Sequence, residues 1–326
     1  MATVVDSQFS VDLILQAQRE LRGLVHRTPL VVSQSLSDHL GTPVYLKLEC
    51  LQKTGSFKPR GAFFKMLSLT PEERAAGVVA VSGGNHAQGA AYAAKKLGLQ
   101  ATICMPKTTP ANYLNATRGY GAEIVLCDNI AAAFAEAERL RQKGLTLVHP
   151  FDDPHVAAGQ GTVGLEILED LPDVSRVYVS IGGGGLIAGM ATIMKAAHPD
   201  IRIIGCETEG ADAMAKAVAA GGIVELAAIT SIARTLGSPK VSPFTLEAVQ
   251  RLVEEVVVVS DAEAVAGLER ILERTKTLVE PAASCCLAAA ERHRGTFQRG
   301  EKIVLLMCGG NVSLADVCQF RSDFGG

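Results

Sequence analysis

Short runs of β-branched residues alternate with longer, alanine-rich segments of helical period along most of the chain, from about Val78 onward. Such alternation is typical of βαβ units, in which parallel strands form a sheet covered by helices on both faces. The predicted strands are 78–81, 101–104, 123–127, 145–148, 176–181, 201–206, 254–259 and 302–307. The predicted helices are 86–97, 131–142, 155–169, 186–197, 261–274 and 282–292. The pattern therefore predicts an α/β protein.

The order of these elements predicts two domains, each with a mostly parallel twisted sheet flanked by helices. A length of 326 residues is enough for two hydrophobic cores. Residues 67–147 hold consecutive strand–helix steps and are expected to form the smaller domain. Residues 1–66 and 148–326 are expected to supply the other sheet and form the larger domain. No linker rich in Pro, Gly or Ser marks the boundaries, so they are inferred from the pattern of elements.

Composition favours a protein that acts on a small molecule. The chain has 31 Lys and Arg against 34 Asp and Glu, and it has no Trp, so neither a basic surface nor an aromatic platform for nucleic acid is expected. No segment has the ~20 apolar residues that a membrane span requires, and the N-terminus does not resemble a signal peptide. The eight cysteines lack metal-binding spacing and are expected to be reduced and buried. We therefore expect a cytoplasmic protein.

Three glycine-rich turns follow predicted strands and precede helices: SGGNH, GGGG and CGGN. In open α/β sheets, ligands bind beyond the carboxyl ends of the strands. The three turns are therefore expected to share one site.

The run Gly182–Gly185 is the strongest of these signals. Successive backbone N–H groups at a helix start can converge on an anion, so this turn predicts a phosphate cup. An alternative is a dinucleotide site, because Gly183, Gly185 and Gly189 resemble that fingerprint and Glu207 ends the next strand. The residues alone leave both open.

The segment KTGSFKPRGA places Lys58 between an aromatic residue and a proline. Lysines are usually solvated surface charges, but desolvation beside Phe57 would lower the pKa of this amine and make it nucleophilic. In SGGNH, the hydroxyl of Ser82, the amide of Asn85 and the ring of His86 can either cap the helix or bind a carboxylate. Cys308 either packs in the core or allows a ligand to approach closely.

Taken in order, the motifs SFKPRGA, SGGNHAQG, HPFDDPHVAAGQGT, GGGGL, VEPAAS and CGGNV resemble the pyridoxal-phosphate enzymes of the tryptophan-synthase fold, also called fold type II. They are most similar to the branch of threonine/serine dehydratases and serine racemases. The similarity runs from about residue 27 to residue 312. It implies that the glycine cup holds the phosphate of pyridoxal 5'-phosphate rather than a dinucleotide.

The resemblance also implies roles for individual residues. Lys58 is expected to form the Schiff base with the cofactor and to act as the general base. Cys308 is expected to lie against the pyridine nitrogen, where a neutral partner favours elimination. The whole expected cofactor site is Phe57, Lys58, Asn85, Gly182, Gly183, Gly184, Gly185, Leu186, Glu280 and Cys308. The expected substrate-carboxylate loop is Ser82, Gly83, Gly84, Asn85 and His86.

By the same resemblance, the expected activity is that of a carbon–oxygen lyase: a dehydratase, or ammonia-lyase, that converts a β-hydroxy-α-amino acid to a 2-oxo acid and ammonia. Relatives of this size imply a homodimer or homotetramer. Because the sequence ends soon after the last motif, we expect no C-terminal regulatory extension. A non-catalytic binding protein with this fold is the alternative of another class, and the intact Lys58 argues against it.

Three departures from the family pattern bear on substrate and metal. Gly83 stands where the racemases have a serine, which argues against serine racemase activity. Arg234 and Thr235 replace an acid and a glycine, which makes phenylserine or hydroxyaspartate a candidate substrate beside threonine and serine. A divalent-cation site at Glu207 and the carbonyl of Ala211 would lack its later acid, because position 213 is an alanine.

Overall fold

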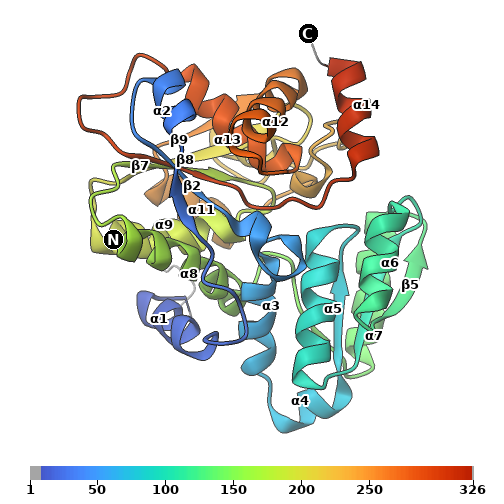
Figure 1. Ribbon diagram of the computed structural model, residues 1–326. Helices are drawn as coiled ribbons and strands as arrows, with labels where there is room; N and C mark the ends of the chain where they lie inside the picture. The colour runs from blue at the N-terminus through green and yellow to red at the C-terminus, as the bar shows by residue number, and fades with distance from the viewer. Residues whose placement is uncertain (1–8, 325–326) are drawn as a thin grey trace.

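The computed structural model describes residues 9–324 and contains two separate sheets (Figure 1). The larger has the strand order β1-β2-β10-β7-β8-β9, and the smaller has the order β5-β4-β3-β6. Strands of the larger sheet are β1 (Leu30–Val32), β2 (Val44–Lys47), β7 (Arg176–Ser180), β8 (Arg202–Thr208), β9 (Glu255–Val259) and β10 (Ile303–Leu306). Strands of the smaller sheet are β3 (Val78–Val81), β4 (Ala101–Pro106), β5 (Glu123–Cys127) and β6 (Thr146–Leu147).

Helices cover both sheets. They are α1 (Val11–Glu20), α2 (Gln34–Leu40), α3 (Lys58–Leu67), α4 (Pro71–Ala76), α5 (Asn85–Leu97), α6 (Ala111–Gly119), α7 (Ile130–Gln142), α8 (Pro154–Asp170), α9 (Gly185–Ala197), α10 (Ala213–Ala220), α11 (Pro243–Leu252), α12 (Asp261–Thr275), α13 (Pro281–Arg292) and α14 (Leu314–Phe324). Short 3-10 helices are η1 (Glu49–Leu51), η2 (Lys53–Gly55) and η3 (Arg234–Leu236). Figure 1 shows α5, α6 and α7 around the smaller sheet and α12 and α13 beside the larger one. Within residues 9–324, no helix is long and apolar enough to cross a membrane.

The α/β fold class is confirmed. All sheet pairings are parallel except that of β1 with β2. Central strands such as β3, β7 and β10 are buried along their whole length, as parallel strands covered on both faces require. The division into domains at residues 67 and 147 stays a prediction. The first eight residues, where the expectation of no signal peptide partly falls, lie outside the described range.

Several elements differ from the sequence-based boundaries. The predicted strand 201–206 is β8, which begins at Arg202 and continues to Thr208, so that Glu207 is its last residue but one. The predictions begin at residue 78 and therefore omit β1, β2 and α1 to α4, although α1 is amphipathic and has Ser10 as its N-cap. After residue 78 they omit α6, α10, α11 and α14. Lys58 is the first residue of α3.

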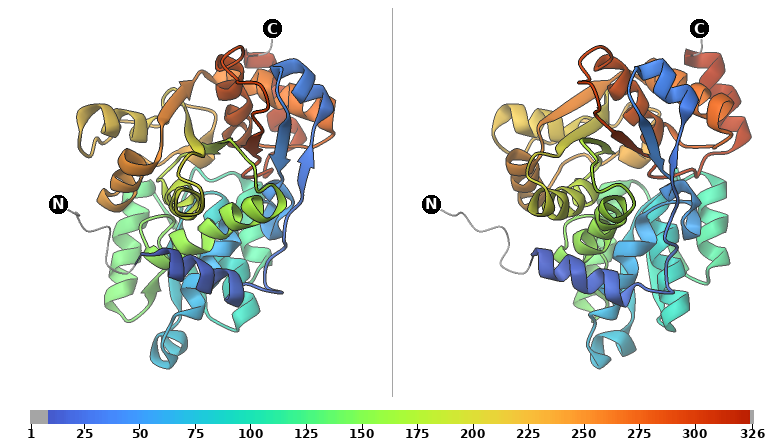
Figure 2. Two further views of the ribbon diagram at one scale, coloured as in Figure 1. Left: turned by 90° about the vertical axis from the view of Figure 1, so that its left-hand side faces the viewer. Right: turned by 60° about the vertical axis from the view of Figure 1, so that its left-hand side comes forward.

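Helices α8 and α9 lie side by side in both views of Figure 2. Their backbones touch at glycines: a Cβ at Gly189 would lie 2.2 Å from the carbonyl oxygen of Ala157 and 2.7 Å from the nitrogen of Gly161. Side chains at Gly189 are thus excluded, and the helices approach more closely than larger residues permit. This contact sets how closely α8 and α9 pack.

Candidate functional site

The three glycine-rich turns meet at one pocket of about 470 Å³. Strands β3, β7 and β10 end on the side where the turns lie, as the sequence predicts. Every residue expected at the cofactor site lines this pocket, together with Phe151, Ser180, Thr235, Leu236 and Ala282. The expected carboxylate loop, 82–86, lines a larger adjoining pocket that also reaches Lys58.

The glycine cup has no room for side chains. A Cβ at Gly183 would lie 2.0 Å from the ring of Phe151, and one at Gly185 would lie 2.9 Å from the Phe151 backbone. Gly184 has a φ of +94°, in the left-handed region that favours glycine. Because α9 begins at Gly185, its free N–H groups and positive dipole end lie at this cup. The cup is therefore suited to a phosphate.

Lys58 lies at the start of α3, with its amine at the pocket. Its Nζ donates a hydrogen bond of 2.9 Å to the carbonyl oxygen of Pro150 and lies 5.0 Å from the centre of the Phe57 ring. The side chain is partly accessible from the pocket, yet burial lowers its pKa to about 8. A Cβ at Gly89 in α5 would lie 3.0 Å from the Lys58 Cβ, so α5 presses against the lysine. This amine is more readily deprotonated than an ordinary lysine.

Glu280 immediately precedes α13 and collects hydrogen bonds from two other segments. Its Oε1 accepts from Asn85 Nδ2 and from Thr235 Oγ1, each at 2.8 Å. Asn85 Oδ1 in turn accepts from Asn311 Nδ2 at 2.8 Å. Burial raises the pKa of Glu280 to about 7, although the bonds from Thr235 and Asn85 work against that shift. The carboxyl group thus orients the Asn85 amide beside the lysine.

The carboxylate loop is shaped by its own polar groups. Ser82 Oγ accepts a hydrogen bond from the Gly84 nitrogen at 3.0 Å, and His86 Nε2 lies 2.8 Å from the carbonyl oxygen of Val148. Burial lowers the pKa of His86 to about 3, so its ring is neutral. A Cβ at Gly83 would lie 2.8 Å from Thr109 Oγ1. Because α5 begins at Asn85, the loop presents a helix N-terminus to the larger pocket.

Cys308 lines the same pocket as the glycine cup and is a buried, neutral thiol. It is 3% exposed, its Sγ is 3.6 Å from the carbonyl oxygen of Ala282, and burial raises its pKa well above the usual value. A thiol of this kind provides a neutral partner for a ring nitrogen.

The expected metal ligands lie outside both pockets. The two carboxylate oxygens of Glu207 accept hydrogen bonds from the Met214 and Ala215 nitrogens, at 3.0 and 2.8 Å, and Ala211 pairs with Thr208 in an isolated bridge. Among residues 9–324, no group of three or more His, Cys, Asp or Glu side chains is placed to hold a metal ion. Glu207 therefore caps α10, and the same bonds leave it poorly placed for a ribose.

Two contributors to the site are not predicted from the sequence. The Pro150 carbonyl acts through the backbone, and its only signal is membership of the HPFDDP run. Thr235 stands out as a departure from the family pattern, but no role for it follows from that departure. Its hydroxyl bond to Glu280 depends on a contact between residues 45 positions apart.

The chain is similar to known proteins over most of its length. The sequence profile of the family described as "Pyridoxal-phosphate dependent enzyme" matches residues 21–309. The chain is 45% identical over 307 residues to L-threonine ammonia-lyase of Geobacter sulfurreducens, covering 94% of this chain and 76% of that protein. It is 38% identical over 322 residues to the catabolic L-threonine dehydratase TdcB of Escherichia coli K12, covering 98% of both.

Two solved structures have the same fold over nearly the whole chain. Maize serine racemase superposes with a TM-score of 0.91 at 36% identity, covering 97% of this chain and 98% of its own. A threonine deaminase from the organism abbreviated T.th. superposes with a TM-score of 0.88 at 38% identity, covering 94% of this chain and 99% of its own.

Proposed function

The chain belongs to the family of pyridoxal-phosphate dependent enzymes, and we propose that it is an ammonia-lyase that acts on a β-hydroxy-α-amino acid of the threonine or serine type. The products are a 2-oxo acid and ammonia. The observation that carries the proposal is the convergence of a lysine of lowered pKa, a side-chain-free glycine cup and a neutral thiol in one pocket. The identities of 38–45% to threonine dehydratases and ammonia-lyases support the reaction type.

The pocket fits pyridoxal phosphate. Gly182–Gly185 and the start of α9 would bind its phosphate. Lys58 would bond to its carbonyl carbon, and Cys308 would lie against its ring nitrogen. Asn85 has a second N–H on Nδ2 beside its bond to Glu280, and this hydrogen would meet the ring hydroxyl. When bound, the cofactor supplies an electron sink that makes the substrate α-proton removable.

The chain's own residues then bind and orient the amino acid and move its proton. The loop 82–86, with the N-terminus of α5, binds the α-carboxylate. The neutral His86 adds no charge to the carboxylate loop. The amine of Lys58 takes the α-proton as general base, and the Pro150 carbonyl oxygen orients that amine between steps.

A borohydride experiment tests this assignment. The purified protein is loaded with pyridoxal phosphate, reduced, digested and mapped by mass spectrometry, and 2-oxo acid formation from threonine and serine is measured in parallel. The proposal requires that the reduced cofactor is attached to Lys58 and that K58A forms no 2-oxo acid. Attachment to another lysine, or no product from any β-hydroxy amino acid, would contradict it.

The larger pocket supports two finer substrate candidates. Its lining includes the exposed Arg234, a cation suited to the second carboxylate of hydroxyaspartate, and Phe134, an apolar wall suited to the ring of phenylserine. A kcat/KM series over threonine, serine, hydroxyaspartate and phenylserine ranks these candidates. If Arg234 selects an acidic substrate, R234A lowers kcat/KM for hydroxyaspartate but not for threonine.

We also propose that the protein is cytoplasmic and assembles as a homodimer or homotetramer. Sedimentation analysis measures the mass of the assembly in solution and so tests the oligomeric state.

A further inference from the structure

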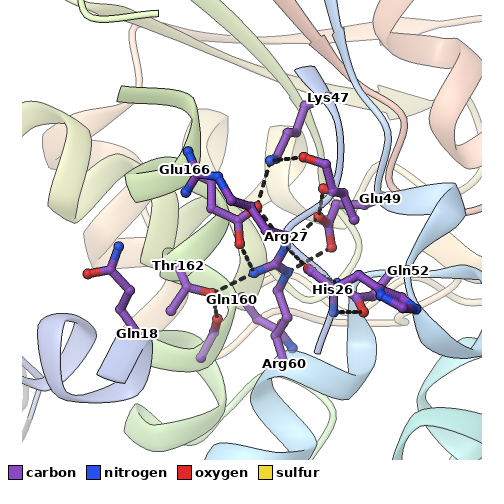
Figure 3. A network of polar contacts seen from close by, with 12 residues as sticks. Gln18, His26, Arg27, Lys47, Glu49, Gln52, Arg60, Gln160, Thr162 and Glu166 are labelled. Atoms are coloured by element: carbon purple, nitrogen blue, oxygen red, sulfur yellow. Dashed lines mark hydrogen bonds and ion pairs between the residues drawn. The ribbon is translucent and has the colours of Figure 1, made fainter. Parts of the chain in front are cut away.

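A cluster of four charged side chains is buried at the first turn of α3, the helix that begins with Lys58 (Figure 3). Lys47, Glu49, Arg60 and Glu166 are 0%, 0%, 1% and 7% exposed. Two positive and two negative charges balance within the cluster. Buried charges of this kind persist only when they are paired and hydrogen-bonded, so each member depends on the others.

Arg60 is the centre of the cluster. Its Nε and Nη2 donate to the two carboxylate oxygens of Glu49 at 2.8 and 2.7 Å. Its Nη1 and Nη2 donate to the two oxygens of Glu166 at 2.7 and 3.0 Å, and Nη1 also donates to Thr162 Oγ1 at 3.1 Å. Lys47 Nζ donates to Glu166 at 2.6 Å. Only the planar guanidinium can bind two carboxylates in this forked manner, and a lysine cannot replace it.

The cluster joins four elements, one of them β2 through Lys47, at the first turn of α3. Arg60 is two residues after Lys58, whereas Glu49 lies in η1 and Glu166 in α8. The backbones of α3 and α8 also meet there, because a Cβ at Gly159 would lie 2.6 Å from both the Arg60 carbonyl oxygen and the Gly61 Cα. These contacts hold the first turn of α3 against both η1 and α8.

Helix α8 meets α9 on another part of its surface, through the contact of Gly189 with Ala157 and Gly161 described above. Helix α9 begins at the glycine cup, and α3 begins at Lys58. Helix α8 therefore stands between the two helices whose first residues form the site, and it contacts both without intervening side chains.

We propose that Arg60, held by Glu49 and Glu166, is a positioning residue that sets the place of the Lys58 amine relative to the Gly182–Gly185 cup. Arg60 lines neither pocket and touches no reacting atom. This inference rests on the proposed function, since it assumes that Lys58 and the cup hold the two ends of one cofactor.

The test compares charge-balanced variants. R60M alone leaves a net negative charge in the core, whereas R60M/E49Q leaves the neutral pair of Lys47 and Glu166, so the fork is lost without an unpaired charge. The matched control is R176M/E301Q, which removes another buried arginine, 1% exposed, with a 3.0 Å ion pair to Glu301 at the far end of β7. R60K keeps the charge but not the fork. For each, Tm, kcat, KM and the fraction of bound cofactor that borohydride fixes to Lys58 are measured.

We expect R60M/E49Q to lose roughly 10- to 100-fold in kcat, because a displacement of about 1 Å at a reacting group has an effect of that size. KM changes little, and the borohydride-fixed fraction falls. The kcat of R60K and its borohydride-fixed fraction lie between those of R60M/E49Q and of the wild type. R176M/E301Q keeps the wild-type kcat and borohydride-fixed fraction, even if its Tm falls as much as that of R60M/E49Q.

Equal kcat for R60K, R60M/E49Q and the control at comparable Tm would overturn the inference and leave the cluster a purely structural one. If R60M/E49Q does not fold, R60K is compared with R176K instead. A lower kcat in R60K than in R176K at comparable Tm supports the inference, and equal kcat overturns it. Failure of the proposed function is distinguishable, because the wild-type cofactor would then not map to Lys58 at all.

Discussion

The Nζ of Lys58 donates a hydrogen bond to the main-chain oxygen of Pro150 across 2.9 Å. A carbonyl oxygen is neutral, so this bond orients the amine without the strong stabilisation of the charged form that a carboxylate partner would give. Burial then decides the ionisation of the amine and lowers its pKa to about 8 from the ordinary 10.5.

The first prediction concerns cofactor capture by the apoenzyme. Only the deprotonated amine attacks a carbonyl carbon, so the rate of pyridoxal phosphate uptake should be half-maximal near pH 8 and level off about one pH unit above it. Stopped-flow absorbance from about pH 6.5 to about pH 11, a range that spans the lowered and the ordinary lysine pKa, measures it. K58A should show no such phase. A rate that is still rising at the upper end of this range would mean that burial does not depress this lysine.

The second prediction concerns the glycine cup. Gly183→Ala places a Cβ 2.0 Å from the Phe151 ring, and overpacking of this kind costs about 1–3 kcal/mol. Because the strain falls on the phosphate site, we expect the Kd for pyridoxal phosphate to rise roughly 10-fold or more, as absorbance titration measures. Gly222→Ala, which meets open space, is the control. Unchanged affinity in Gly183→Ala would exclude the cup as the phosphate site.

Most elements after residue 78 are predictable from sequence because runs of β-branched residues alternate there with helical periods, but α6, α10, α11 and α14 are not predicted, and neither is any element before that residue. The glycine turns are recognisable from the residues alone, whereas the expected role of Lys58 comes from the family resemblance, because a single lysine is usually a solvated surface charge. The Arg60 cluster is not predictable, since it joins residues up to 119 positions apart and each charge alone resembles a surface residue. Thr235 stands out in the sequence as a departure from the family pattern, but its hydrogen bond to Glu280 is not predictable, because the two residues lie 45 positions apart.

The third prediction concerns metal. Both carboxylate oxygens of Glu207 already accept amide hydrogens from α10, at 3.0 and 2.8 Å, so a divalent cation would have to displace them. We therefore expect dialysis against EDTA to leave kcat unchanged and added Mg²⁺, Ca²⁺ or Mn²⁺ to leave Tm unchanged. A loss of activity that one of these ions restores would show that the helix cap opens to admit metal.

The fourth prediction concerns pH and stability. Burial raises the pKa of Glu280 to about 7 in the folded chain from 4.5, so folding favours its protonated form. The stability gained from this group is complete below about pH 4.5 and is lost as pH rises through 7. Thr235→Val removes a hydrogen bond to the charged form, which raises that pKa further and extends the loss to higher pH.

Urea denaturation of wild type and Thr235→Val at about pH 5, 6, 7 and 8 measures this effect, and each unit of pKa difference corresponds to about 1.4 kcal/mol in the free energy of unfolding. The two curves should converge at the acid end and separate as pH rises. Glu280→Gln should remove the contribution of this group in both backgrounds, and curves that stay parallel throughout would assign the pH dependence to other residues.

The last prediction concerns the choice between elimination and racemisation at position 83. A Cβ on Gly83 would lie 2.8 Å from Thr109 Oγ1, and that buried hydroxyl has no hydrogen-bond partner among residues 9–324. A serine at position 83, as in the racemases that this sequence resembles, therefore needs Thr109 to move. The experiment measures the D-serine formed from L-serine by chiral chromatography. We expect wild type and Thr109→Ala to form none, Gly83→Ser to form little, and the double variant to form clearly more. Because Thr109→Ala makes the room that the new hydroxyl requires, the two changes should act more than additively. A double variant that still forms 2-oxo acid but no D-serine would show that the missing hydroxyl is not what restricts this site to elimination.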